Sequence, residues 1–160
     1  MSAGVELVAY APSLARAFHD INIAWIETMF EVEPHDREVL ENPQAMIIDK
    51  GGEVLFARLP ELGIVGACAL MPNPAGGVEL TKMGVLEEAR GRGVGEFLLA
   101  AAIEQARHMP APLFLLTNRK CATAIRLYER HGFVHDGEIM AKHGGDYGRC
   151  DVAMRFVGRD

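Results

Sequence analysis

The chain has 160 residues, of which 49% are hydrophobic and 24% are charged, and its formal net charge is −6 at pH 7. This length suits a sizeable core, so we expect residues 1–160 to form a single domain. The composition excludes a disordered chain, and the acidic balance argues against a nucleic-acid partner, which requires clustered Lys and Arg. It also leaves room for an acidic pocket that would favour a cationic substrate.

Targeting signals and metal-ligand patterns are not evident. The N-terminal sequence MSAGVELVAY lacks the basic region and apolar core of a signal peptide. No apolar run approaches the roughly 20 residues of a transmembrane helix, so we expect no membrane partner. The widely spaced Cys68, Cys121 and Cys150 are typical of reduced thiols, which predicts a cytoplasmic protein without disulfides. The histidines show no ligand spacing, and no metal is expected.

The first half of the chain predicts a strand, two helices and a four-stranded antiparallel meander. Apolar side chains that recur every three or four residues indicate the first helix, and Lys50-Gly51-Gly52 indicates a hairpin turn. The predicted elements are strand Val5–Tyr10, helices Pro12–Phe30 and Arg37–Leu40, and strands Ala45–Asp49, Glu53–Arg58, Ile64–Met71 and Val78–Met83.

The second half predicts alternating helices and strands. Pro112–Thr117 is a continuous apolar run, which is typical of a buried strand parallel to its neighbours. Gly132 stands where a helix C-cap is expected. The predicted elements are helix Gly93–His108, strand Pro112–Thr117, helix Cys121–His131, and strands Phe133–Met140 and Asp151–Val157, the last two joined by a loop containing His143-Gly144-Gly145-Asp146.

A glycine-rich segment lies between the strand that ends at Met83 and the following helix, and it reads Arg90-Gly91-Arg92-Gly93-Val94-Gly95. Unpaired N–H groups at a helix start attract anions, glycine lets a ligand approach the backbone, and arginine adds donors for phosphate. A P-loop would need Lys-Ser or Lys-Thr after the glycines, and a dinucleotide fingerprint would need glycine in place of Glu96. A loop that merely turns the chain remains an alternative.

Two motifs resemble the GNAT superfamily of acyl-CoA-dependent N-acyltransferases. Arg90, Gly93 and Gly95 fill its pyrophosphate-loop pattern Arg-x-x-Gly-x-Gly. One strand later, Cys121–Phe133 is similar to its pattern Asn-x-x-Ala-x-x-Leu-Tyr-Glu-x-x-Gly-Phe. The resemblance implies an α/β fold of the α+β type, with a mixed, curved sheet of six to seven strands, helices on both faces and central parallel strands that splay apart.

The resemblance also implies an activity. It predicts transfer of an acetyl group from acetyl-CoA to a primary amine of a small molecule or peptide, by direct attack in a ternary complex. Alternatives are a transferase for another acyl-CoA, such as succinyl- or propionyl-CoA, and a non-catalytic acyl-CoA-binding sensor. Many members of the family form dimers, so a homodimer is expected.

Cofactor-binding residues follow from the resemblance position by position. The loop Arg90–Gly95 would hold the pyrophosphate of coenzyme A, and the backbone of Met83, Gly84 and Val85 would contact the pantetheine and the thioester oxygen. Cys121 replaces the family's asparagine; it would still line the channel, and Asn118 would supply the missing contact. A covalent acyl-cysteine at Cys121 is an alternative, although the sequence places no base beside it.

Tyr128 and Glu79 are the candidate catalytic residues. Tyr128 matches the family's general acid, and its pKa near 10 exceeds that of a thiol at about 8.5. Glu79 lies on the strand before the glycine loop, where the family often has its general base. A core tyrosine and a solvent-facing glutamate are the structural alternatives, and an ordered water is an alternative base. Second-rank base candidates follow the first helix, namely Glu31, Glu33, His35 and Asp36.

Overall fold

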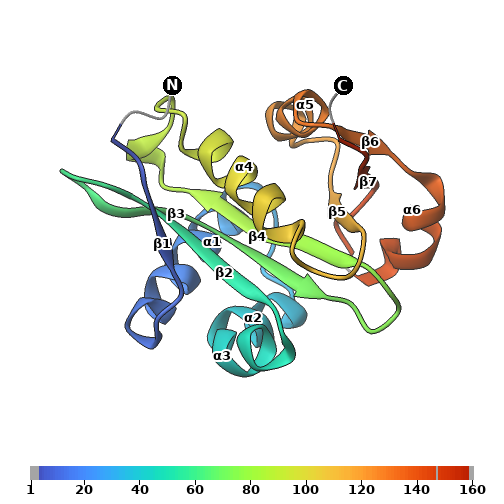
Figure 1. The fold of residues 1–160 in the computed structure, drawn as a ribbon, viewed down its shortest axis with the longest axis horizontal. Helices are drawn as coiled ribbons and strands as arrows, with labels where there is room; N and C mark the ends of the chain where they lie inside the picture. The colour runs from blue at the N-terminus through green and yellow to red at the C-terminus, as the bar shows by residue number, and fades with distance from the viewer. Residues whose placement is uncertain (1–3, 147, 159–160) are drawn as a thin grey trace.

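The computed structural model describes residues 4–146 and 148–158, which form a mixed α/β fold around a seven-stranded open sheet (Figure 1). The strand order is β1-β2-β3-β4-β5-β7-β6, with β4 and β5 parallel and the other neighbours antiparallel. The expected fold class is thereby confirmed. The strands are β1 Glu6–Ala9, β2 Glu53–Leu59, β3 Gly63–Pro72, β4 Val78–Val85, β5 Leu113–Thr117, β6 Phe133–His135 and β7 Val152–Phe156.

Helices cover both faces of this sheet (Figure 1). Helices α4 and α5 share a hydrophobic core with one face, and α1 and α2 share a second core with the opposite face. In the described part of the chain, no helix is long and apolar enough to cross a membrane. The helices are α1 Ala15–Met29, α2 Pro34–Glu41, α3 Pro43–Met46, α4 Val94–Ala106, α5 Ala122–Arg130 and α6 Gly137–His143.

Successive side chains of a strand point to opposite faces of the sheet, and this alternation produces the two cores. In β4, Val78 and Leu80 face the core beneath α4, together with Leu98 and Leu99 of that helix. On the other face, Phe18 of α1 is fully buried in the second core. Burying this apolar surface on both sides is what holds α1 and α4 against the sheet.

The two parallel strands separate halfway along their length. Their pairing covers only Val78–Leu80 with Leu113–Leu115. In the same region β4 carries a bulge, because Lys82 and Met83 together oppose Cys68 of β3. Lys82 has a φ of 53°, which a non-glycine residue rarely adopts, and it is one of the two bulge residues. The C-terminal halves of β4 and β5 therefore diverge, as the resemblance predicted.

Two predicted strands were wrong. Ala45–Asp49 is not a strand, since Pro43 starts α3 and the turn Ile48–Lys50 ends at Gly51, which has a left-handed φ of 90°. The glycine signal therefore ends a helical turn and does not make a hairpin. The predicted strand Phe133–Met140 stops at His135, because the Asp136 carboxylate accepts from Glu138 N and Ile139 N and starts α6, which replaces the second half of the expected strand and the first residues of the loop after it.

The start of one helix and the direction of one strand pair also differ from the prediction. Helix α2 begins at Pro34 and not at Arg37, because Glu33 and Asp36 form a capping box around its first turn. Strand β5 is parallel to β4 but antiparallel to β7. An apolar run indicates burial on both faces and says nothing about strand direction.

Candidate active site

A cavity of about 620 Å³ lies where β4 and β5 diverge. Its walls come from the ends of these strands, from α1, from α5 and from the segment before β7. Residues Thr81–Val85 and Leu116–Asn118, which follow the last paired residues, all line it. Backbone groups that a neighbouring strand would otherwise use thus face a space large enough for a small ligand.

One end of the cavity lies at the start of α4. Arg90 and Gly95 line it, and Gly91 and Gly93 both have a left-handed φ of 79°, which glycine adopts without strain. The first turn of this 13-residue helix directs unpaired N–H groups toward the loop. This end is therefore suited to an anion such as a diphosphate.

Helix α5 brings Tyr128 to the same cavity, and Cys121, the residue just before this helix, also lines it. Tyr128 is only 9% exposed, and its ring centroid lies 5.9 Å from that of Phe133. Burial raises the pKa of the Tyr128 hydroxyl above its usual range, with smaller contributions from Cys121 and Cys68. The phenol is consequently protonated at neutral pH and able to donate a proton into the cavity.

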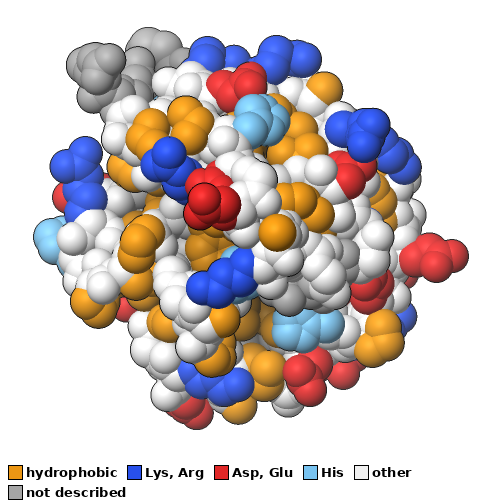
Figure 2. Space-filling model, turned by 90° about the vertical axis from the view of Figure 1, so that its right-hand side faces the viewer, with side chains coloured by type: hydrophobic (Ala, Val, Ile, Leu, Met, Phe, Trp, Pro, Cys, Tyr) orange, Lys and Arg blue, Asp and Glu red, His pale blue; other side chains and the backbone are white. Residues whose placement is uncertain are grey.

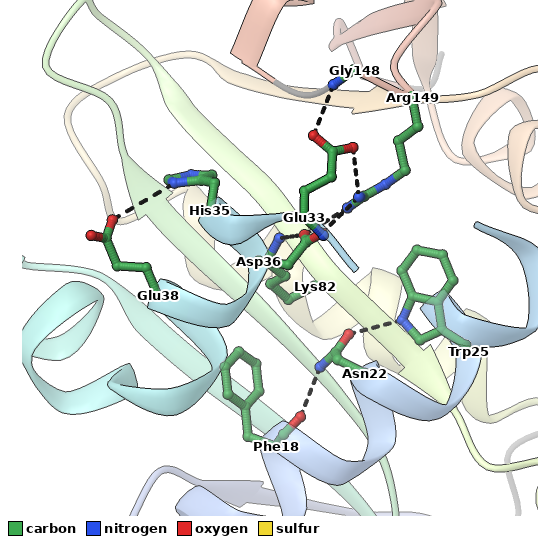
Figure 3. Close-up of polar contacts among 10 residues, drawn as sticks. All are labelled: Phe18, Asn22, Trp25, Glu33, His35, Asp36, Glu38, Lys82, Gly148 and Arg149. Atoms are coloured by element: carbon green, nitrogen blue, oxygen red, sulfur yellow. Dashed lines mark hydrogen bonds and ion pairs between the residues drawn. The ribbon is translucent and has the colours of Figure 1, made fainter. Parts of the chain in front are cut away.

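The opposite end has an apolar wall from the C-terminal part of α1 and the residue after it, namely Trp25, Met29 and Phe30. Trp25 Nε1 donates to Asn22 Oδ1 at 2.9 Å, and Asn22 Nδ2 donates to Phe18 O at 3.0 Å (Figure 3). Gly84 of β4 lies directly beneath the indole, since a Cβ there would be 2.4 Å from Trp25 Cδ1. Glycine at this position permits the close approach of Trp25 to the strand.

A buried ionic cluster joins Asp36 and Glu33 to Lys82 and Arg149, and these two cations line the cavity (Figure 3). The fully buried Asp36 accepts from Lys82 Nζ at 2.7 Å and from both terminal nitrogens of Arg149 at 2.7 Å. Glu33 accepts from Arg149 Nη1 at 3.2 Å and from Gly148 N at 3.0 Å. The cluster thus fixes α2, β4 and the segment before β7 to one another.

Protonation in this cluster follows from burial and charge. Burial alone would raise the pKa of Asp36, but hydrogen bonds from Arg149 and the charge of Lys82 outweigh it, so the pKa lies well below its usual range. Burial lowers the pKa of Lys82, and the ionised Asp36 opposes this change. Burial also raises the pKa of the Cys150 thiol to about 12, which keeps this cavity-lining cysteine protonated.

Residues 50–135 match the family model for the acetyltransferase (GNAT) domain, which is more than half of the chain. The chain belongs to the GNAT acetyltransferase family. A search among curated proteins found no match to its sequence.

Solved structures share the GNAT fold across nearly the whole chain. A GNAT-family acetyltransferase from Staphylococcus aureus Mu50 aligns with a TM-score of 0.82 at 19% identity, covering 95% of this chain and 98% of its own. An acetyltransferase from Streptococcus agalactiae 2603 aligns with a TM-score of 0.76 at 21% identity, covering 96% and 98%. A chimera of the spermidine N-acetyltransferase SpeG from Vibrio cholerae and hSSAT aligns with a TM-score of 0.67 at 21% identity, covering 96% and 93%.

The residues that the sequence assigned to this GNAT site fall into two groups. The structure brings eight of them together around the cavity, namely Met83, Gly84, Val85, Arg90, Gly95, Asn118, Cys121 and Tyr128. The others lie outside the lining, namely Glu79, Gly91, Arg92, Gly93 and Val94. Arg92 pairs with Glu61 at 2.6 Å, and Glu79 is 7% exposed within β4, close enough to Lys82 and Cys150 to act on both electrostatically.

Asn118 has a structural role beside the cavity. Its Nδ2 donates to Arg149 O at 2.6 Å, and its Oδ1 accepts from Lys120 N at 2.8 Å. Both ends of the amide are therefore used to shape the loop between β5 and α5. A contact with the cofactor would use only the remaining capacity of this side chain.

The sequence interpretation missed the cations of the cavity, namely Lys82, Lys120, Arg126, Arg130 and Arg149. No motif marks them, because they come from four separate segments of the chain. Asp36 was considered only as a base, yet it is the acceptor at the centre of the buried cluster. Lys82 carries no local signal either, because β4 also contains the polar residues Glu79 and Thr81.

Proposed function

We propose that this GNAT domain transfers an acetyl group from acetyl-CoA to a primary amine of a small molecule or peptide by direct attack in a ternary complex. The observation that carries the proposal is the cavity between the diverging β4 and β5, which extends from Arg90 to Tyr128. Its glycine-rich end suits the diphosphate of coenzyme A, and its diverging strands suit the extended pantetheine arm. Bound acetyl-CoA would supply the thioester carbonyl that a neutral amine attacks.

The residues of the chain would act in the following way. Arg90 and the N–H groups at the start of α4 hold the diphosphate. Backbone N–H groups of Met83, Gly84 or Val85, beyond the last pair with β5, hold the carbonyl oxygen as charge develops on it. Tyr128 donates its proton to the departing sulfur, in keeping with its place in the lining and its raised pKa.

We further propose that Glu79 receives the proton of the amine. Its buried carboxylate lies on β4 two residues before Thr81, which lines the cavity, and its charge acts on Cys150 in the opposite wall. Because Glu79 itself does not line the cavity, the proton would reach it through a water molecule.

The sequence left two alternatives to this proposal: a different acyl-CoA donor, and a sensor that binds acyl-CoA without catalysis. The acyl group is proposed to be acetyl, as the resemblance implies, with succinyl or propionyl transfer as the alternative. A non-catalytic sensor would bind acetyl-CoA and transfer its acyl group to no amine. We also propose that residues 1–160 form one domain of a cytoplasmic protein, as free thiols at Cys68, Cys121 and Cys150 suggest. A homodimer is proposed from the family resemblance, and light scattering of the purified protein would test it.

Charge reversal at Arg90 should abolish micromolar binding of acetyl-CoA. A charged hydrogen bond contributes about 1.5–3 kcal/mol, so its loss weakens affinity by about 10- to 150-fold, and the repulsion between glutamate and phosphate adds to this. The measurement is calorimetric titration of acetyl-CoA into the wild type and Arg90→Glu. Arg107→Glu is the matched control, because Arg107 is exposed and lies outside the cavity. Equal losses in both variants would contradict the placement of the diphosphate, and no binding to the wild type would overturn the proposed function.

Glu79→Gln should lower kcat/KM at pH 7 by about 10²- to 10⁴-fold, the contribution of a positioned base. Since a free alkylamine has a pKa of about 10.4, the variant should regain activity as the pH rises from 7 to 9.5, more steeply than the wild type. Thiol release with a fixed amine at each pH measures this, and Glu88→Gln, an exposed glutamate outside the lining, is the control. An unchanged rate at pH 7 would remove Glu79 as the base.

A further inference from the structure

The charge of the cavity lining contrasts with the charge of the chain. Among the described residues that line the cavity, six are cationic and none is Asp or Glu: Lys82, Arg90, Lys120, Arg126, Arg130 and Arg149. The whole chain has a formal net charge of −6. Figure 2 turns the side with α5 and α6 toward the viewer and shows side chains of both signs interspersed over that face. The absence of carboxylates is therefore a local property of the described lining.

Three of these cations belong to the end of the cavity that suits the diphosphate. Arg90 precedes α4, and Arg126 and Arg130 lie one helical turn apart on α5. Leu127, between them, lies beside Gly95, since a Cβ on that glycine would be 3.9 Å from Leu127 Cδ2. The phosphates of coenzyme A account for these three arginines.

The other three cations lie at the far end. Helix α5 is about 13 Å long, and Lys120 precedes its first turn whereas Arg130 is its last residue. Lys120 Nζ donates to Met29 O at 3.0 Å and lies 4.8 Å from the centroid of the Phe30 ring. Arg149 Cζ lies 5.9 Å from the same centroid. Phe30 thus has a cation near it from each of two separate segments.

The carboxylates of this region lie behind the cations and outside the cavity lining. Asp36 accepts from Lys82 and Arg149, Glu33 accepts from Arg149, and neither carboxylate lines the cavity. Glu79, the proposed proton acceptor, also lies outside the lining. Lys120 is exposed and lies at the rim. An acceptor that enters beside Trp25, Met29 and Phe30 therefore meets apolar surface and the positively charged side of these pairs.

From this arrangement we infer that the amine acceptor carries a carboxylate, as a small apolar α-amino acid does, and that Lys120 at the rim holds this carboxylate. The inference rests on the proposed function, because it concerns the second substrate of the same cavity. A polyamine would bring two or more positive charges to a lining that provides cations, which disfavours it. The acidic pocket that the net charge left open for a cationic substrate is not present among the described lining residues.

Matched acceptors test the inference in the whole protein. L-methionine and L-phenylalanine would be compared with their carboxamides, which keep the amine and the side chain but lack the carboxylate, and with spermidine. We expect kcat/KM to be about tenfold or more higher for each acid than for its amide, the contribution of one charge-assisted hydrogen bond. The pKa of each acceptor amine would be used to correct for its neutral fraction.

Lys120→Glu should raise KM for the amino acids about tenfold or more while leaving the Kd of acetyl-CoA within about threefold. Lys50→Glu, an exposed lysine outside the lining, is the control for charge reversal. Transfer to spermidine or to the amides with equal or higher kcat/KM would overturn the inference and leave the proposed function intact. An equal loss of acetyl-CoA affinity in Lys120→Glu would also overturn it, since Lys120 would then belong to the cofactor end.

A binding readout keeps the test independent of turnover. Trp25 is the only tryptophan of the chain and it lines the cavity, so its fluorescence reports occupancy. With coenzyme A present, titration with the amino acids should change this fluorescence at concentrations about tenfold lower than titration with the amides. Saturable binding of acetyl-CoA without any response to the amino acids would overturn the inference, whereas failure to bind acetyl-CoA would overturn the proposed function itself.

Discussion

Replacing Asp36 by asparagine is expected to lower the free energy of unfolding by about 3–5 kcal/mol, the usual cost of removing one partner from a buried ion pair. The Asp36 side chain is fully buried and accepts hydrogen bonds from Lys82, Arg149 and Glu33 N. An amide cannot neutralise the two cations, and its NH₂ group would face their donors. Urea unfolding followed by circular dichroism measures the change, with an unchanged m-value as the sign that two-state behaviour is kept.

The matched control is Asp20→Asn. Asp20 pairs with Arg16 at 3.1 Å on the surface of α1, where an ion pair contributes about 0–1 kcal/mol. Equal effects of the two substitutions would contradict the structural role of the buried cluster.

The ionic cluster around Asp36 should also make the free energy of unfolding of the wild type fall in acid. Because the pKa of Asp36 is lowered in the folded protein, its contribution to stability is complete above its unfolded value of about 3.9. The contribution is lost as the pH falls below that value toward the folded pKa. Asp36→Asn should lack this part of the pH dependence, so the difference between the two proteins should shrink below about pH 4.

Tyr128→Phe should lower kcat by about 10²- to 10⁴-fold, the range for a positioned general acid, and leave the Kd of acetyl-CoA nearly unchanged. The ring would still pack against Phe133 in the core, so stability should change little. Since burial keeps the pKa of Tyr128 above its usual value, the wild-type rate should show no decline from loss of this proton up to about pH 9.5. Thiol release under saturating acetyl-CoA measures kcat, and calorimetry measures Kd.

Tyr10→Phe removes the same hydroxyl group from a tyrosine outside the cavity and is the control. An unchanged kcat in Tyr128→Phe would leave Tyr128 as a packing residue. A loss of acetyl-CoA binding would instead assign its hydroxyl to the cofactor.

Local sequence patterns predicted the elements whose signals are short-range. The strand, glycine-rich loop and helix around Arg90–Gly95 were predicted in order, because turn geometry and helix propensity depend on neighbouring residues. The spacing of Cys121 and Tyr128 placed both on one face of a helix, and both line the cavity. Where the prediction failed, as at Ala45–Asp49 and at Phe133–Met140, Gly51 and Asp136 serve as helix caps, signals that also occur in hairpins and loops.

The sequence by itself thus determined the family, the order of most elements and the glycine-rich loop that precedes α4. Only the tertiary structure decided which charged side chains form ion pairs with one another. Arg149 lies 113 residues after Asp36, and Lys82 lies 46 residues after it, yet all three make one cluster, because the bulge in β4 and the capping box of α2 direct their side chains to one point. Such long-range contacts carry no local signal. The cationic lining that now argues for a carboxylate-bearing acceptor arises in the same way, from segments that only the folded sheet brings together.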